Sequence, residues 1–305
     1  MSDLKSPGSL PGNPFDSKAI LDGIRRRVEV ETPTAAPEQV NRLATMVADG
    51  YRDLPATIER VAGRDGRGDH LVARSAWGQD QPGILVLSHF DTVHPIGFIK
   101  RLPFHIEGDS AFGPGIYDMK GGAYLAYHAF RQICAAPERS PLGVTQLYVS
   151  DEEIGSPTSR ALIEAEGHKA KYVLVTELAR DGGKVVTGRK GVARFEIFIK
   201  GVPSHAGIPP QDGRSAIREL GNVIQTLEGM NDPEHARTLA AEIGFDLVDT
   251  RTSGGSDGNF TAPHTATIDG LGVDGKGAHT HYEQMYISSI EPRARLLHRL
   301  YQTLQ

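Results

Sequence analysis

Cysteine is nearly absent from this sequence, since Cys134 is the only one among 305 residues. One thiol cannot form an internal disulfide, and a chain without disulfides suits a reducing compartment. No apolar run reaches the roughly 20 residues that cross a membrane, and the opening residues lack the apolar core of a secretion signal. We therefore predict a cytoplasmic protein that has no membrane partner.

An excess of charge of one sign is also missing. The chain has 33 Lys and Arg against 38 Asp and Glu, a formal net charge of -5. Such a charge gives no general attraction to nucleic acid. Hydrophobic residues make up 39% and charged residues 23%, which is ordinary for a globular protein with a sizeable core. We predict a globular protein without a nucleic-acid partner.

Hydrophobic periodicity indicates an α/β fold. Apolar residues recur at helical spacing over residues 16–32, 36–51 and 287–304, with Asp16 or Ser17 as the first N-cap. Short apolar runs that end in polar residues are typical of strands buried on both faces of a parallel sheet, and they cover residues 83–91, 144–153 and 170–178. Residues 121–136 and 156–167 read as crossover helices. We expect a central, mostly parallel sheet flanked by helices, preceded by a flexible arm over residues 1–15.

Side chains that can bind metal follow the predicted strands where each one ends. These are His89, Asp91, Asp151, Glu152, Glu153 and Glu177, with Asp118 in the loop before a crossover helix and His279 and His281 after a strand-like segment. In open α/β sheets the ligand crevice lies beyond the carboxyl ends of the strands. Imidazole and carboxylate without thiolate are typical of zinc, or a similar divalent cation, in a catalytic site. A network of salt bridges is the structural alternative.

The spacing of His89 and Asp91 adds a second prediction. Residues two apart at a strand end point to the same face, so Asp91 can accept the second ring N–H of His89 and orient the ring. His94, a few residues further on, reads as a loop histidine and not as a ligand. A pair of cations would also explain three adjacent carboxylates at 151–153, because one could bind metal while its neighbour acts on water.

Ordered motifs give this chain a resemblance to the M20 family of metallopeptidases, closest to its glutamate carboxypeptidase and aminoacylase branch. The motifs are "HFDTVHP", "GPGIYDMKGG", "SDEEIGS", "VTEL", "GVPSHAG" and "GAHTHYE", and the similarity runs from about residue 20 to the C-terminus. The resemblance implies a zinc-peptidase-like catalytic α/β domain interrupted by a smaller α+β lid or dimerisation domain. On this chain the catalytic domain would cover residues 16–187 and 234–305, and the lid residues 188–233.

The resemblance also implies two zinc ions and assigns the residues that bind each of them. Asp118 would bridge both ions. His89 and Glu177 would complete one site, and Glu153 and His279 the other.

Further roles follow from the same resemblance. Glu152 would be the general acid/base, taking a proton from a water shared by the two metals and delivering it to the leaving amine. Asp91 would support the catalytic site, and Asp151 reads as a structural hydrogen-bonding residue. His205, in the lid motif, would help to hold the developing oxyanion. His281 stays open as an alternative ligand to His279.

We expect a strand over residues 193–201 and a helix over residues 215–229 in the lid, which departs from the family pattern beyond them. Relatives continue beyond the helix that ends near Met230 with further strands and a helix, which supply an asparagine and an arginine for substrate binding. Here residues 229–249 pass directly into what reads as the next helix of the catalytic domain, so about half of the lid is missing. We predict a monomer, because the family's oligomers form mainly through the lid.

Two functions remain open at this point. One is zinc-dependent hydrolysis of an amide or peptide bond, of carboxypeptidase or N-acyl-amino-acid amidohydrolase type, with an N-acyl amino acid or short peptide as the small-molecule substrate. The other is a metal-binding scaffold that is weakly active or inactive because its lid is incomplete.

Overall fold

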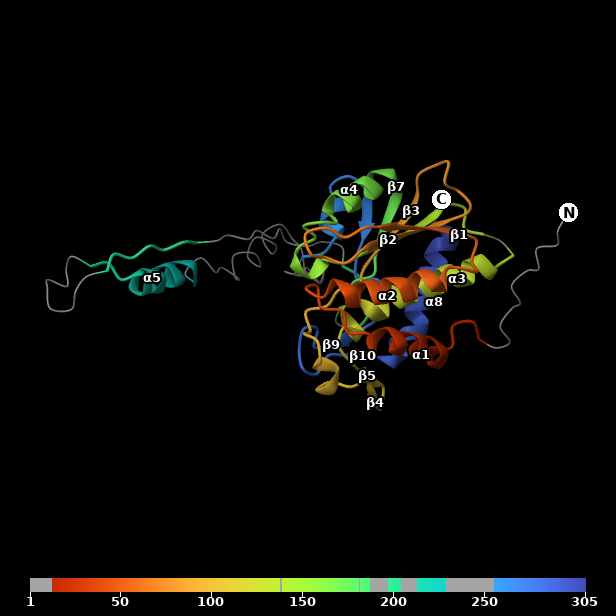
Figure 1. Ribbon diagram of the computed structural model, residues 1–305. Coiled ribbons are helices and arrows are strands. Elements are labelled where there is room, and N and C mark those ends of the chain that lie inside the picture. The colour runs from red at the N-terminus through yellow and green to blue at the C-terminus, as the bar shows by residue number, and fades with distance from the viewer. Residues whose placement is uncertain (1–12, 138, 181, 187–196, 204–212, 229–254) are drawn as a thin grey trace, which may run out of the picture. The chain divides into compact units, whose positions relative to one another are not determined.

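The computed structural model describes residues 13–137, 139–180, 182–186, 197–203, 213–228 and 255–305 (Figure 1). The chain divides into two compact units, residues 1–191 with 250–305, and residues 192–249. The described helices are α1 (Ser17–Val28), α2 (Pro37–Gly50), α3 (Gly121–Ala135), α4 (Arg160–Lys169), α5 (Ala216–Glu228), α7 (Gly258–Thr261) and α8 (Ile290–Thr303). The described strands are β1 (Ala56–Val61), β2 (His70–Ser75), β3 (Gly83–His89), β4 (His105–Glu107), β5 (Ser110–Phe112), β6 (Val144–Val149), β7 (Ala170–Val175), β8 (Ala266–Ile268), β9 (Gly275–Lys276) and β10 (Gln284–Tyr286).

The central sheet has the strand order β1-β2-β6-β3-β7-β8 within the described residues. The pairings of β3 with β6, β3 with β7 and β7 with β8 are parallel, whereas β2 pairs antiparallel with both β1 and β6. His89 lies opposite Val149, and Leu87 lies opposite Val175. The carboxyl ends of β3, β6 and β7 therefore meet at one edge, and the prediction of a mostly parallel sheet flanked by helices is confirmed.

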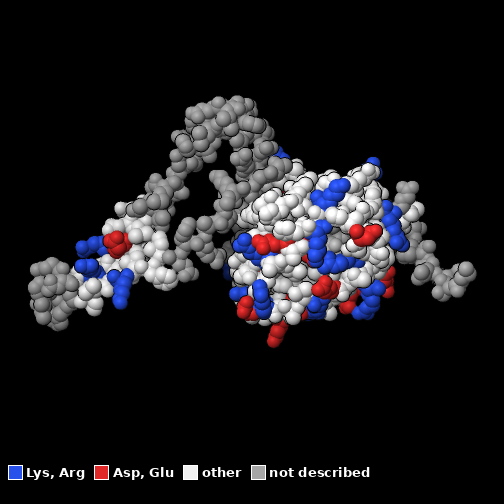
Figure 2. Space-filling model, turned by 90° about the horizontal axis from the view of Figure 1, so that it is seen from above, with Lys and Arg blue, Asp and Glu red and all other residues white. Residues whose placement is uncertain are grey.

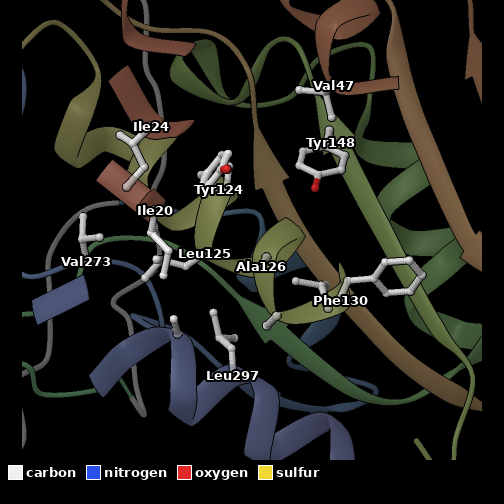
Figure 3. Packing of buried hydrophobic residues seen from close by; sticks show 14 of the residues in the cluster. Ile20, Ile24, Val47, Tyr124, Leu125, Ala126, Phe130, Tyr148, Val273 and Leu297 are labelled. Atoms are coloured by element: carbon white, nitrogen blue, oxygen red, sulfur yellow. The ribbon is translucent and has the colours of Figure 1, made fainter. Parts of the chain in front are cut away.

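Alternation along β3 divides the core between the two faces of the sheet. Ile84 and Val86 belong to the larger cluster, which also takes in the buried faces of α1, α2, α3 and α8 (Figure 3). Leu85 and Leu87 belong to the second cluster, together with Ile163 of α4. Because successive side chains of a strand point to opposite faces, a strand that is apolar throughout can bury both faces at once.

A local signal fixes the start of the first helix. The Asp16 carboxylate accepts hydrogen bonds from the backbone N–H groups of Lys18 and Ala19, at 3.4 and 3.1 Å. The prediction of an N-cap at this point is confirmed, and such a cap typically stabilises a helix by about 1 kcal/mol. The N-terminal arm predicted over residues 1–15 lies mostly outside the described residues.

A second sheet, ordered β4-β5-β10-β9 and antiparallel throughout, was not predicted. Its strands are two or three residues long, too short for a period-2 pattern to be recognised. The loop between β9 and β10 carries His279, so this sheet positions one of the predicted ligands.

The second unit contains the described part of the predicted lid. Helix α5 agrees with the helix expected after residue 214, and Val202 forms a bridge with Arg214. Residues 197–200 belong to the strand expected over 193–201, yet they form no strand. His205 and the helix expected within residues 229–249 lie outside the described residues.

The surface drawn in Figure 2 has Lys and Arg interspersed with Asp and Glu. Among the helices that the structure describes, none combines the length and the apolar character needed to span a bilayer.

Gly122, at the start of α3, is required by a close backbone approach. A Cβ atom there would lie 2.0 Å from the carbonyl oxygen of Thr176, the residue before Glu177. We predict that Gly122→Ala lowers the free energy of unfolding by at least about 1–3 kcal/mol, the usual cost of overpacking a core. Urea unfolding of the purified chain measures this. Gly221→Ala is the matched control, because no atom lies within 4 Å of that Cβ position in α5. An equal loss in both variants would contradict the prediction.

Asp257, just before α7, is a buried acid whose ionisation opposes folding. Its Oδ1 accepts the Ser156 hydroxyl at 2.5 Å, and burial, followed by the charges of Asp91 and Asp151, raises its pKa to about 7. Because an unfolded Asp titrates near about 3.9, the folded chain binds this proton more tightly, and stability is lost as the pH rises through about 4 to about 7. We predict that Asp257→Asn, measured without metal by thermal unfolding, gains stability relative to the parent across this window. A difference independent of pH would contradict this assignment.

Candidate metal centre

The carboxyl edge of the central sheet gathers six of the predicted side chains. His89 ends β3, Glu152 and Glu153 lie in a short 3-10 turn after β6, and Glu177 follows β7 by two residues. Asp118 comes from the loop before α3, and His279 from the β9–β10 loop of the second sheet. Residues far apart in the chain thus meet because parallel strands end together.

Asp118 lies between the two histidines. Its Oδ1 is 3.2 Å from Nε2 of His89, and its Oδ2 is 3.0 Å from Nε2 of His279. The imidazole of His279 also lies 3.1 Å from Oε2 of Glu153. On the other side, Nε2 of His89 lies 3.6 Å from Glu177 and 3.9 Å from Glu152. One carboxylate therefore faces both halves of the cluster, and each half has its own histidine and glutamate.

The orientation of His89 differs in detail from the prediction. Its Nδ1 is 2.9 Å from the main-chain oxygen of Asp91 and 3.4 Å from the Asp91 carboxylate, so the carbonyl is the nearer acceptor. With Nδ1 donating, Nε2 keeps its lone pair for the cluster. The Asp91 carboxylate accepts the Thr34 hydroxyl at 2.7 Å and the N–H groups of Glu152 and Glu153 at 3.3 Å. Asp91 therefore positions the His89 ring through its main-chain oxygen and the two glutamates through its carboxylate.

The three adjacent acids of residues 151–153 have different surroundings. Asp151 is fully buried and accepts bonds from the N–H and hydroxyl of Thr158, at 2.6 and 2.7 Å, and from the hydroxyl of Ser159 at 2.5 Å. Glu152 and Glu153 instead face the histidines. Hydroxyl and amide donors stabilise the first carboxylate, which leaves the other two for the cluster.

The cluster has the features of a divalent metal site. Among the described residues, ligand atoms of His89 with Glu152 and Glu177, and of His89 with Asp118 and Glu153, lie within 4.8 Å of one another. Oε1 of Glu153 is buried and has no hydrogen-bond donor among the described residues. A buried carboxylate oxygen without a partner is costly, and a cation would remove that cost. The donor set of nitrogen and oxygen ligands fits zinc.

Protons take the place of cations in the metal-free chain. Hydrogen bonds to Asp118 and Glu153 raise the pKa of His279 to about 11. Burial opposes the charged form of His89, but the contacts with Asp118 and Asp91 outweigh it and raise its pKa well above the usual value. Burial, and then Glu177, raises the pKa of Glu152 well above its usual value. Metal binding would have to displace such protons, so metal uptake would depend on pH.

Glu283 and His94 also support this edge, and their support was not predicted from the sequence. The fully buried Glu283, in the same loop as His279, accepts the backbone N–H of Asp118 at 2.9 Å and Nε2 of His94 at 2.6 Å. His94 is thus a loop histidine, as predicted, but one that supports the cluster. His281 stacks on the ring of Phe98, with ring centroids 5.5 Å apart. The only sequence signal for Glu283 was its place four residues after His279.

The chain is similar to several curated proteins and solved structures. Carboxypeptidase G2 of a Pseudomonas species (strain RS-16) is 32% identical over 226 residues, which cover 73% of this chain but 54% of that protein. Aminopeptidase PepT from Bacillus cereus shares the fold with a TM-score of 0.66 and 17% identity, over 95% of this chain and 99% of that one. Human carnosine dipeptidase 1 shares the fold with a TM-score of 0.67 and 12% identity, over 94% of this chain and 97% of that one.

The chain also matches the model of a protein family. The model of Peptidase family M20/M25/M40 aligns with residues 85–303, which include every side chain of the cluster described above. The chain spans about half the length of carboxypeptidase G2, so the similarity does not extend over the whole of that relative. By this match the chain belongs to Peptidase family M20/M25/M40.

Proposed function

We propose that the chain hydrolyses an amide or peptide bond with two zinc ions held at the carboxyl edge of its sheet. The observation that carries the proposal is the position of Asp118, whose two carboxylate oxygens face His89 and His279 at 3.2 and 3.0 Å. A carboxylate between two imidazoles, each with its own glutamate, has the arrangement expected of a bridging ligand in a two-metal site. Membership of a peptidase family supports the same reaction class.

Each ion would have a set of protein ligands. Asp118, His89 and Glu177 would hold one, and Asp118, Glu153 and His279 the other. When bound, zinc would supply Lewis acidity, lowering the pKa of water and polarising a carbonyl group. Asp91 would orient His89 so that Nε2 faces the ion, through its main-chain oxygen, which lies 2.9 Å from Nδ1.

Glu152 would move the proton. It lies at the edge of the cluster, 3.9 Å from His89, and its side chain is 15% exposed, so it faces both the cluster and the outside. Burial and Glu177 favour its protonated form. A carboxylate in such a place can take a proton from the attacking water and return it to the leaving amine. The substrate would be an N-acyl amino acid or a short peptide, and a cytoplasmic location stays a prediction.

The lid decides between this function and the second hypothesis. His205 would help to stabilise the developing oxyanion, but it lies outside the described residues. The chain covers 54% of the length of carboxypeptidase G2. The half of the lid that is expected to be missing supports, as the second candidate, a zinc-binding chain with weak activity or none. Both candidates require the metal centre, and turnover alone separates them.

The adjacent glutamates should separate metal binding from proton transfer. Glu152→Gln keeps size but cannot carry a proton, so zinc content should stay at the parent level while turnover falls by roughly 10²–10⁴-fold. Glu153→Gln should weaken zinc binding instead. Elemental analysis and hydrolysis of N-acyl amino acids and short peptides, with and without added zinc, measure both effects. Equal loss of zinc in the two variants would refute the assigned roles, and a parent that binds zinc without turnover would establish the second candidate.

The shortened lid predicts a monomer. Family oligomers are expected to form through the lid, and here α5 is the one lid helix that the described residues contain. A small lid buries little surface, and a stable dimer needs about 1,200–2,000 Å² in total. Light scattering should therefore give a mass near the 33.0 kDa of one chain. A stable dimer that also hydrolyses substrate would contradict the proposed role of the missing half.

A further inference from the structure

Glu283 has an unusual set of partners for a residue outside the proposed ligand set. Its Oε1 accepts the backbone N–H groups of Tyr117 and Asp118, both at 2.9 Å. Its Oε2 accepts the N–H of Gly115 at 3.0 Å and Nε2 of His94 at 2.6 Å. The side chain is completely buried. Four donors on one carboxylate satisfy nearly all of its acceptor sites, and charge-assisted bonds of this kind are the stronger ones.

These bonds join the segments that carry Asp118 and His279. Glu283 lies four residues after His279 in the β9–β10 loop, while its carboxylate holds the turn of residues 115–118. The backbone N–H of Asp118 is itself one of the donors, so a shift of Glu283 moves Asp118 directly. Gly113 adds a main-chain bond, donating its N–H to the carbonyl of Glu283 at 3.3 Å.

His94 holds the other side of Glu283. Its ring stacks on Phe98, with centroids 4.4 Å apart, and the side chain is 7% exposed. Phe98 in turn stacks on His281 of the β9–β10 loop. The loop after β3, which begins at the His89 end of that strand, is thereby fixed to the loop that carries His279.

We propose that Glu283, held by His94, is a positioning residue that sets the separation of Asp118 and His279 and thereby the affinity of the chain for its two zinc ions. The inference rests on the proposed function for the identity of the ligands. The hydrogen-bond partners of the Glu283 carboxylate described above include no side chain of a proposed ligand. Glu283 acts through the backbone of Asp118 and the loop of His279.

The test is zinc affinity, measured on the full chain by competition with a chelator of known affinity. Glu283→Gln keeps the shape but offers one acceptor oxygen where the three backbone N–H groups and His94 need two. Changes in residues that orient metal ligands typically weaken metal binding 10–100-fold, and we expect a loss of about that size. Activity should return toward the parent value with excess zinc, because Glu152 and the ligands are unchanged.

His94→Phe is the milder variant. It keeps a ring against Phe98 and leaves the three backbone bonds of Glu283 in place, so it should fold even if Glu283→Gln does not. A weakening of zinc binding in the same direction, but smaller, is expected. Zinc affinity equal to the parent in His94→Phe and in any folded Glu283→Gln would overturn the inference.

Glu166→Gln is the matched control. Glu166 is also a buried acid, bonded to Arg74 at 2.5 and 3.0 Å and to Lys169 at 2.9 Å. Arg74 pairs with Thr145 at the opposite end of β6 from the cluster. The control should lose thermal stability but keep the parent's zinc affinity. If Glu166→Gln and Glu283→Gln weakened zinc binding equally, the effect of Glu283 would be one of general stability, and the inference would be overturned. A parent that binds no zinc would instead overturn the proposed function.

Discussion

Burial of several carboxylates at one edge of a sheet is the constraint on which the rest of this structure depends. Each buried anion needs donors or a counter-charge, because removing it from water without either is prohibitively costly. Asp151 has hydroxyl and amide donors, and Asp91 has the Thr34 hydroxyl and two backbone N–H groups. Glu283 has three backbone N–H groups and a histidine.

The remaining acids of the edge are of a different kind. Asp118, Glu152 and Glu153 face the two imidazoles of the cluster, and one oxygen of Glu153 has no donor among the described residues. The carboxylates of this edge therefore fall into two groups. The supporting carboxylates accept hydrogen bonds from hydroxyl, backbone or histidine donors. The cluster carboxylates face the histidines, where their oxygens can bind a cation. This difference in hydrogen-bond partners is the physical reason for assigning metal binding to the second group of carboxylates.

Much of this could be predicted from the sequence because it is encoded locally. The apolar runs of β3, β6 and β7 end two or three residues before His89, Glu152 and Glu177, and parallel strands bring such ends together whatever the side chains are. The helices followed from periodicity, and α1 from its Asp16 cap. The contact of His89 with the main-chain oxygen of Asp91 was missed in detail, since residue spacing cannot distinguish a carboxylate from a carbonyl two residues away.

Other features could not be predicted because their cause lies far away in the chain. The bonds of Glu283 to residues 115–118 and to His94 span more than 160 residues, and nothing near Glu283 indicates them. The second sheet is built from strands too short to show alternation. The lid is a third case. Its predicted strand lacks strand structure in the described residues 197–200, and pairing in a sheet depends on a partner that the residues of a strand do not specify.

The division of the chain separates loading of the metal centre from completion of the active site. Every proposed ligand, together with Asp91, Glu152, His94 and Glu283, belongs to the unit formed by residues 1–191 and 250–305. Among the described residues, the interactions that orient the ligands are internal to that unit, since the hydrogen bonds of Asp91 and Glu283 run to other residues of it. Under the proposed function, we therefore expect metal affinity to depend on this unit. Turnover would also require stabilisation of the developing oxyanion, which the resemblance assigns to His205 of the other unit. No proposed ligand comes from the lid, so we expect a chain with a shorter lid to keep its metal centre.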